Sequence, residues 1–141
     1  MQRPKRLLLV DDTVDILYAI KRGLESRNFV ADAFSSPIEA LAAFEPGKYD
    51  FGLLDVQMPQ MSGFELCREL TKRDPSLKFC FFTAYEVYRE QFKKEFPEIK
   101  SDCFLKKPMS ISRLAEEINK YLAETPPANR IEQAPTIKTS E

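Results

Sequence analysis

The sequence predicts a doubly wound α/β protein with a five-stranded parallel sheet, and two patterns support this prediction. First, short apolar runs alternate with segments of helical periodicity five times between Lys5 and Glu124. Second, the apolar runs are continuous, as in Leu7-Leu8-Leu9-Val10, which is typical of strands that are buried on both faces. Short connections and right-handed crossovers between such strands place helices on both faces of the sheet.

The expected strands are short and are bounded by polar or turn-forming residues. They cover residues 5–10, 29–34, 50–54, 77–82 and 102–105. Asp32 interrupts the second strand, so we expect that strand at an edge of the sheet. Thr83 closes the fourth strand, and Lys106-Lys107-Pro108 follows the fifth.

The expected helices begin at recognisable capping residues. They cover residues 13–27, 36–46, 62–74 and 86–96, and a last helix begins at Ser110 or Ser112 and ends near Glu124. Ser36 precedes Pro37 at the first helical position, and Ser62 and Glu65 form a capping box, so the second and third helix starts are well defined.

Each helix carries an apolar stripe that we expect to face the sheet. The stripes comprise Ile16, Ile20 and Leu24 with Leu17 beside them; Ile38, Leu41 and Ala42; Phe64, Cys67 and Leu70; Tyr88, Phe92 and Phe96; and Ile111, Leu114, Ala115, Ile118, Tyr121 and Leu122. We interpret these stripes as ordinary core.

Charge and composition exclude several classes of function. The chain has 21 basic and 22 acidic side chains, and its net charge of −1 argues against direct nucleic-acid binding, which needs a basic surface. The apolar run from Leu7 to Val10 is too short for a signal peptide or a membrane span, so we expect a cytoplasmic protein without membrane contact. Histidine is absent, which removes histidine catalysis and most zinc sites.

The three cysteines are predicted to be buried free thiols. Cys67, Cys80 and Cys103 form no C-x-x-C motif, their number is odd, and each has apolar neighbours. The chain length suits one domain, which we place at residues 1–124. Residues 125–141 are polar and proline-containing, and we expect them to be a disordered tail.

Polar side chains follow four of the five predicted strands. They are Asp11 and Asp12 after the first strand, Asp55 after the third, Thr83 at the fourth and Lys107 after the fifth. Because the carboxyl ends of parallel strands share one edge of the sheet, we expect these side chains to converge. Three adjacent carboxylates repel one another, and a Mg²⁺ ion with oxygen ligands relieves this repulsion. The set indicates phosphoryl transfer onto a carboxylate.

The chain resembles the receiver domains of response regulators in two-component signalling, and the similarity covers roughly Lys5 to Glu124. It depends on four motifs together: Asp11-Asp12, the segment D-V-Q-M-P-Q-M-S-G from Asp55 to Gly63, Thr83-Ala84, and Lys107-Pro108. The resemblance implies a flavodoxin-like (βα)5 fold with strand order 2-1-3-4-5. It also implies a signalling protein that promotes only its own phosphorylation and dephosphorylation and is otherwise not an enzyme.

The resemblance assigns roles to individual residues. Asp55 is implied to be the phosphoacceptor, which takes its phosphoryl group from a histidine kinase or phosphotransfer protein. Asp12, Asp55 and the backbone carbonyl of Gln57 are implied to hold Mg²⁺, with Asp11 acting through water. Lys107 is implied to pair with Asp55 and then with the phosphoryl group.

The resemblance also implies a switch and a partner surface. Thr83 is implied to bind a phosphoryl oxygen, and Phe104 occupies the position of the family's switch aromatic. The partner surface is implied around the fourth helix, fifth strand and fifth helix, its output protein is unknown, and we expect a monomer or weak dimer. Gln57 and Tyr85 flank the site, and our hypothesis is that the bulk of Tyr85 slows water attack on the phosphoryl group.

Simpler explanations remain open for several of these residues. Asp11-Asp12 could cap the first helix, Thr83 could be an ordinary strand end, Lys107 could be solvated, and Phe104 could be plain core. Two alternatives concern the whole chain: a Mg²⁺-dependent phosphatase or phosphotransferase with Asp55 as nucleophile, and a receiver fragment of a larger regulator.

Overall fold

A computed structural model describes residues 3–84, 88–99 and 103–124 of the 141-residue chain. Four predictions concern residues outside these ranges. They are the disordered tail at residues 125–141, the position of Tyr85, the start of the fourth helix at Glu86, and the start of the fifth strand at Asp102.

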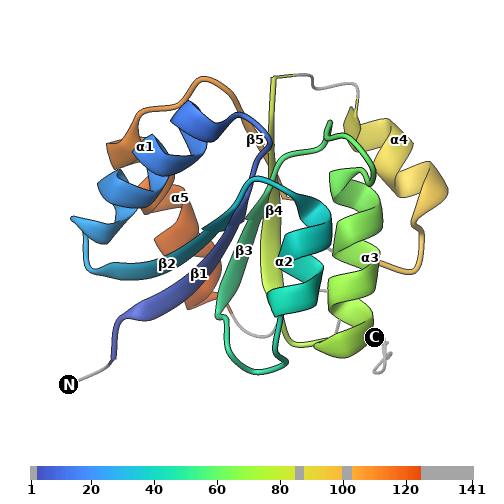
Figure 1. The fold of residues 1–141 in the computed structure, drawn as a ribbon, viewed down its shortest axis with the longest axis horizontal. Helices are drawn as coiled ribbons and strands as arrows, with labels where there is room; N and C mark the ends of the chain where they lie inside the picture. The colour runs from blue at the N-terminus through green and yellow to red at the C-terminus, as the bar shows by residue number, and fades with distance from the viewer. Residues whose placement is uncertain (1–2, 85–87, 100–102, 125–141) are drawn as a thin grey trace, which may run out of the picture.

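Strands and helices alternate along the described residues in the predicted order (Figure 1). The strands are β1 (Lys5–Val10), β2 (Phe29–Phe34), β3 (Phe51–Leu54), β4 (Lys78–Thr83) and β5 (Phe104–Lys106). The helices are α1 (Val14–Glu25), α2 (Pro37–Ala43), α3 (Gly63–Arg73), α4 (Tyr88–Glu95) and α5 (Ile111–Ala123). The predicted helix starts at Ser36 and Ser62 are confirmed, because each side chain accepts a hydrogen bond from the backbone N–H three residues later. The last helix starts at Ser110 rather than Ser112.

The strands form one parallel sheet in the order β2-β1-β3-β4-β5, which confirms the predicted fold class. The register pairs Val10 with both Phe34 and Leu54, so the carboxyl ends of the first three strands are level. The second strand lies at an edge, as Asp32 predicts. Its carboxylate is only half-buried there and accepts a hydrogen bond from the hydroxyl of Tyr49 at 2.7 Å.

The helices form one layer on each face of the sheet, with α1 and α5 on one side and α2, α3 and α4 on the other (Figure 1). Strand side chains alternate between these two layers. Leu7 and Leu9 belong to the core under α1 and α5, whereas Leu8 and Val10 belong to the core under the other three helices. The continuous apolar runs therefore supply both cores at once.

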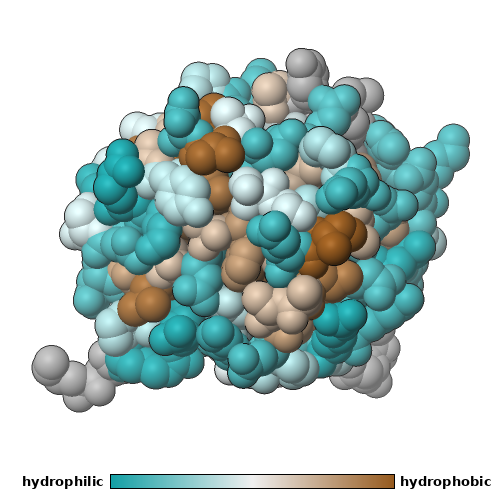
Figure 2. Space-filling view, in the orientation of Figure 1, coloured by the Kyte–Doolittle hydropathy of each residue, from teal (hydrophilic) through white to brown (hydrophobic). Residues whose placement is uncertain are grey.

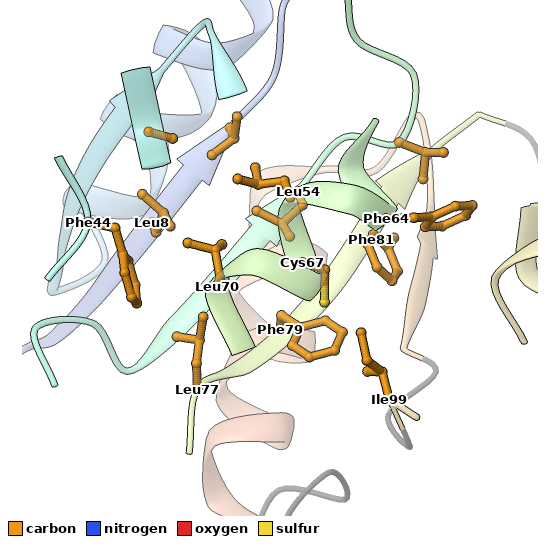
Figure 3. Close-up of a cluster of buried hydrophobic side chains, with 14 of the residues drawn as sticks. Leu8, Phe44, Leu54, Phe64, Cys67, Leu70, Leu77, Phe79, Phe81 and Ile99 are labelled. Carbon is orange, nitrogen blue, oxygen red and sulfur yellow. The ribbon is translucent and has the colours of Figure 1, made fainter. Parts of the chain in front are cut away.

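The core under α2, α3 and α4 is rich in aromatic rings (Figure 3). The ring of Phe64 at the start of α3 lies 5.0 Å from that of Phe81 on β4 and 5.1 Å from that of Phe92 on α4. Phe104 on β5 completes this group, with its ring 5.1 Å from Phe81. Edge-to-face and tilted packing of this kind joins α4 to the two last strands of the sheet.

Two helix orientations differ from the prediction. In α1 the buried residues are Leu17, Ile20 and Leu24, whereas Ile16 is 43% exposed. The periodicity alone cannot choose here, because stripes through residue 16 and residue 17 share Ile20 and Leu24. In α2 the buried positions are Pro37 and Ala40, and the predicted inward residues Ile38 and Ala42 are exposed. Ala40 packs in the core under this helix, so contacts with other elements, and not the local periodicity, select the side that faces inward.

The prediction of three free thiols is wrong for two of the cysteines. Cys80 on β4 and Cys103 just before β5 are joined in a disulfide, with Cα atoms 4.6 Å apart. The pairing of β4 with β5 brings them opposite each other, a relation that sequence separation does not reveal. Cys67 is a buried free thiol, as predicted.

The face that carries α2 and α3 is largely hydrophilic, and its hydrophobic residues form separate small patches (Figure 2). Among the described residues, the large hydrophobic side chains that remain exposed are Val14, Ile16, Tyr18 and Ile38. None of the described helices has the length and apolar character needed to cross a bilayer.

Candidate phosphoryl-acceptor site at the strand ends

Three carboxylates meet at the carboxyl edge of the sheet. Asp11 and Asp12 follow β1, and Asp55 follows β3, the strand paired with β1. Each offers a carboxylate oxygen, and these oxygens lie within 4.8 Å of one another. The predicted convergence of these three acids is therefore confirmed.

Asp11 is buried, and both of its carboxylate oxygens accept hydrogen bonds. Oδ1 accepts the backbone N–H of Thr13 at 2.9 Å, and Oδ2 accepts a hydrogen bond from Lys107 Nζ at 2.8 Å. The residue at the N-cap of α1 is Thr13, so capping does not explain why two aspartates stand here. Asp12 is exposed, and its carboxylate faces the same cluster from the solvent side.

Lys107 links the last strand to the acidic cluster. Its backbone N–H donates to the carbonyl of Thr83 at 2.9 Å, which fixes the residue beside the end of β4. Its Nζ atom lies 2.8 Å from Asp11 Oδ2 and 3.5 Å from Asp55 Oδ1. The alternative of a solvated Lys107 is thus wrong. The ammonium group is closer to Asp11 than to Asp55, whereas the resemblance implies pairing with Asp55.

Asp55 is 8% exposed, and its pKa is raised to about 6. Burial is the largest cause, and the negative charges of Asp11 and Asp12 add to it, while the ammonium group of Lys107 lowers the pKa in part. One lysine therefore does not neutralise three acids. The cluster has an excess of negative charge that a cation with oxygen ligands would relieve.

The loop after Asp55 is held by a close backbone contact at Gly63. Gly63 N–H donates to the carbonyl of Val56 at 2.8 Å, and a Cβ at this position would lie 2.0 Å from the carbonyl oxygen of Asp55. Reciprocal hydrogen bonds between Ser62 and Glu65 then start α3. The sequence motif that contains Gly63 does not indicate its role, because only the folded loop leaves this position no space for a side chain.

Thr83 ends β4, whereas Phe104 begins β5 and pairs with Phe81. Thr83 is buried, and with Phe104 and Arg89 it lines a cavity of about 300 Å³. Phe104 is half-buried, and the guanidinium carbon of Arg89 lies 5.2 Å from its ring centroid. Arg89 was not predicted, because nothing in its sequence neighbourhood distinguishes it from other charged helix residues. Gln57, two residues after Asp55, is exposed.

The family model for the response regulator receiver domain matches residues 7–119. This chain belongs to the response regulator receiver domain family. Receiver domains are signalling domains of two-component systems rather than classical enzymes, and they interact with histidine kinases or phosphotransfer proteins.

Individual relatives include whole proteins and parts of larger ones. The chain is 30% identical over 118 residues to the response regulator receiver protein CpdR of Brucella abortus, covering 84% of this chain and 97% of CpdR. It is 35% identical over 118 residues to the sensor kinase CckA of the same organism, covering 82% of this chain and 12% of CckA. The chain therefore corresponds to a small part of that kinase.

Solved receiver structures share the fold. The response regulator TrrA from Thermotoga maritima, in complex with Mg²⁺-BeF, matches with a TM-score of 0.71 and 32% identity, covering 83% of this receiver and 98% of TrrA. A CheY-like receiver domain protein from Methanospirillum hungatei matches with a TM-score of 0.74 and 29% identity, covering 84% and 94% of the two chains.

Proposed function

We propose that Asp55 is the phosphoacceptor of this receiver and that it takes a phosphoryl group from a phosphohistidine on a histidine kinase or phosphotransfer protein. One observation carries the proposal: a lysine ammonium group lies between Asp11 and Asp55, inside a cluster of three carboxylates at the sheet edge. An Oδ atom of Asp55 attacks the phosphorus, the O–P bond forms while the N–P bond breaks, and the released imidazole nitrogen takes a proton from solvent. With its pKa at about 6, Asp55 is mostly ionised at neutral pH and needs no general base.

The donor set fits Mg²⁺. Three carboxylates offer hard oxygen atoms within 4.8 Å of one another, and Asp12 leaves the cluster open to solvent. Asp12, Asp55 and the backbone carbonyl of Gln57 would hold the ion, with Asp11 acting through water. The TrrA structure contains Mg²⁺ together with a beryllofluoride group. When bound, Mg²⁺ supplies positive charge that offsets the carboxylates and the incoming phosphoryl oxygens.

The remaining residues of the site act on the phosphoryl group once it is in place. Lys107 neutralises one of its oxygens, and the Thr83 hydroxyl donates a hydrogen bond to another. Phosphorylation changes the charge at Asp55 from −1 to about −1.5 to −2, so it favours the arrangement in which both donors turn toward the site. Phe104, which lines the same cavity as Thr83, transmits this change to a partner surface on α4, β5 and α5.

Gln57 and Tyr85 follow Asp55 and Thr83 by two residues in the sequence, and in this proposal they tune the lifetime of the phosphorylated state. The bulk of Tyr85 slows attack by water. Replacing Tyr85 with alanine is expected to speed dephosphorylation, and an unchanged rate contradicts this role.

The proposed functional unit is the domain at residues 1–124. We propose that it works in the cytoplasm as a monomer or weak dimer. Its output is a protein contact and involves neither nucleic acid nor membrane.

Labelling by a small phosphodonor tests the proposal. The chain is incubated with acetyl phosphate and Mg²⁺, and intact mass spectrometry measures the mass increase of one phosphoryl group. Labelling is expected in the wild type and absent in Asp55→Asn. Asp50→Asn is the matched control, because Asp50 lies at the opposite end of the same strand and accepts hydrogen bonds from Arg3 and Arg6. Retained labelling of Asp55→Asn at another residue would overturn the assignment.

A further inference from the structure

The disulfide between β4 and β5 lies inside the core, on the two strands that lead to Thr83 and Lys107. Cys80 and Cys103 are 0% and 2% exposed, and both belong to the core under α1 and α5. The strand register pairs Phe81 with Phe104, and Phe81 N–H donates to the carbonyl of Cys103 at 2.9 Å. The two cysteines are therefore direct neighbours across the pair of strands.

The same two strands carry residues of the proposed site. Thr83 ends β4, the strand that contains Cys80, and Lys107 directly follows β5, which begins after Cys103. Within the described residues β5 is only three residues long and lies at the edge of the sheet, paired with β4 alone. Because such a short edge strand makes few backbone hydrogen bonds, the covalent link at its start helps to hold Lys107 and Phe104 in position.

We propose that the Cys80–Cys103 bond is a reversible thiol–disulfide site, and that its state controls how firmly β5 is held on β4. The co-reactant is a glutathione-type couple. In the closing direction, one cysteine thiolate attacks oxidised glutathione and forms a mixed disulfide, with release of one glutathione thiolate. The second cysteine then attacks the mixed disulfide and releases the second glutathione. The protein thus gives up two electrons and two protons, and one molecule of oxidised glutathione becomes two molecules of the thiol.

Burial makes this exchange depend on local opening of the edge strand. Neither sulfur is reachable in the closed fold, so the reaction proceeds through a state in which β5 has separated from β4. Short edge strands open at lower free energy than central strands do. Cys67 provides the contrast, because it lies on α3 in the opposite core and has no cysteine partner.

The redox state of the disulfide affects signalling through the position of Lys107, and this step rests on the proposed function. With the bond closed, Lys107 and Phe104 keep their places beside Asp55 and Phe81. With the bond open, β5 separates more often, so Lys107 spends less time at the site. The reduced receiver is therefore expected to be labelled more slowly by acetyl phosphate than the oxidised receiver.

Thiol counting tests the proposal directly. The full chain is equilibrated in glutathione buffers of different thiol-to-disulfide ratio, quenched in acid, unfolded and alkylated, and its intact mass is measured. One alkylated cysteine is expected in oxidising buffer and three in strongly reducing buffer, with a continuous transition between them. Three alkylated cysteines at every ratio, or one at every ratio, would overturn the reversible site. Cys67→Ala is the matched control and must show the same transition with one fewer label throughout.

Amide hydrogen exchange tests the effect on β5. The amides of Phe104–Lys106 are expected to exchange at least about tenfold faster in the reduced wild type than in the oxidised one, with β1 unchanged. Equal exchange in both forms contradicts the control of β5. Cys103→Ala should match the reduced wild type in any buffer, and the wild-type comparison stands even if this variant folds poorly. Loss of acetyl-phosphate labelling in both redox forms would refute the proposed function alone, because the thiol count does not depend on it.

Discussion

At the residue scale, the central feature is an aspartate whose charge is unfavourable in the folded chain. Asp55 is buried next to Asp11 and Asp12, and Lys107 offsets only part of the repulsion. A carboxylate that merely anchored its loop would be surrounded by hydrogen-bond donors and would have a lowered pKa. The raised pKa of Asp55 instead indicates that the folded site favours a cation next to this carboxylate. Without a cation, the charge of Asp55 lowers the stability of the folded state.

The first prediction follows from this cost. The pKa of Asp55 is raised from 3.8 to about 6, so the folded state holds its proton more tightly than the unfolded state does. Stability from this group is therefore full below about pH 4 and is lost as the pH rises through about 6. The loss amounts to at most about 3 kcal/mol. In EDTA at pH 7.5, Asp55→Asn is expected to have a higher free energy of unfolding than the wild type, measured by urea denaturation.

The pH dependence distinguishes this effect from a general gain in packing. At pH 4 the difference between Asp55→Asn and the wild type should nearly vanish. Asp50→Asn is a control of opposite sign: burial raises the pKa of Asp50, but the Arg6 backbone N–H and the Arg3 guanidinium lower it overall. That variant should lose stability at pH 7.5. If Asp55→Asn raised the free energy of unfolding equally at pH 4 and pH 7.5, the explanation by the charge of Asp55 would be contradicted.

The second prediction concerns Gly63, which positions the loop after Asp55. A methyl group at Gly63 meets the carbonyl oxygen of Asp55 at 2.0 Å, and backbone atoms cannot move aside as a flexible side chain does. Gly63→Ala is expected to cost about 1–3 kcal/mol in urea denaturation and to reduce acetyl-phosphate labelling. Gly52→Ala on β3 is the control, since a methyl group there meets nothing nearer than 3.8 Å. Equal effects of the two substitutions would show that the contact at Gly63 is unimportant.

At the scale of the elements, each helix is placed by its cap and by the side that it turns to the sheet. Ser36, Ser62 and Ser110 each accept a hydrogen bond from a backbone N–H in the first helical turn. These local bonds depend on residues close in sequence and define where the helices start. The rotation of a helix about its axis depends on contacts with other elements, so it is a separate quantity.

The third prediction tests the rotation of α1. Leu17 is 1% exposed and packs in the core with Ile20 and Leu24, whereas Ile16 is 43% exposed. Leu17→Ala is expected to lower the free energy of unfolding by about 2–5 kcal/mol, the usual range for a buried leucine. Ile16→Ala removes a similar amount of side chain from the surface and is expected to cost less than about 1 kcal/mol. Urea denaturation of both variants measures the difference, and the reverse ranking would contradict the orientation described above.

At the scale of the whole molecule, the parallel sheet gathers residues from distant parts of the chain at one edge. Asp12, Asp55 and Lys107 come from three loops, and each loop follows a different strand of the same sheet. The strands and both cores keep these loops fixed relative to one another, so stability and site geometry are linked. A ligand that binds only the folded arrangement must therefore stabilise the whole domain.

The fourth prediction uses this linkage. At a Mg²⁺ concentration ten times its dissociation constant, the free energy of unfolding is expected to rise by about 1.4 kcal/mol relative to EDTA. Thermal denaturation over a Mg²⁺ series measures the effect. Asp12→Asn should weaken the response, while Asp15→Asn, on an exposed carboxylate in the first turn of α1, should leave it unchanged. A wild-type midpoint that does not move with Mg²⁺ would contradict the proposed metal site.

The local sequence was sufficient to predict the strands and helices and the set of polar residues at the strand ends. Continuous apolar runs defined parallel strands, because a strand covered on both faces has no side for polar residues. The position of acids directly after β1 and β3 predicted the cluster of Asp11, Asp12 and Asp55, because parallel strands share one carboxyl edge. Fold class and the meeting of the three acids were thus determined by patterns within each segment and by general rules of sheet topology.

Only the tertiary structure determined which side of each helix faces the core and which residues from distant segments are in contact. It buried Leu17 instead of Ile16, joined Cys80 to Cys103, and placed the ammonium group of Lys107 closer to Asp11 than to Asp55. Each of these outcomes is a contact between segments distant in the chain. Helical periodicity and sequence spacing describe one segment at a time, whereas packing against a second segment selects among arrangements that are equivalent locally.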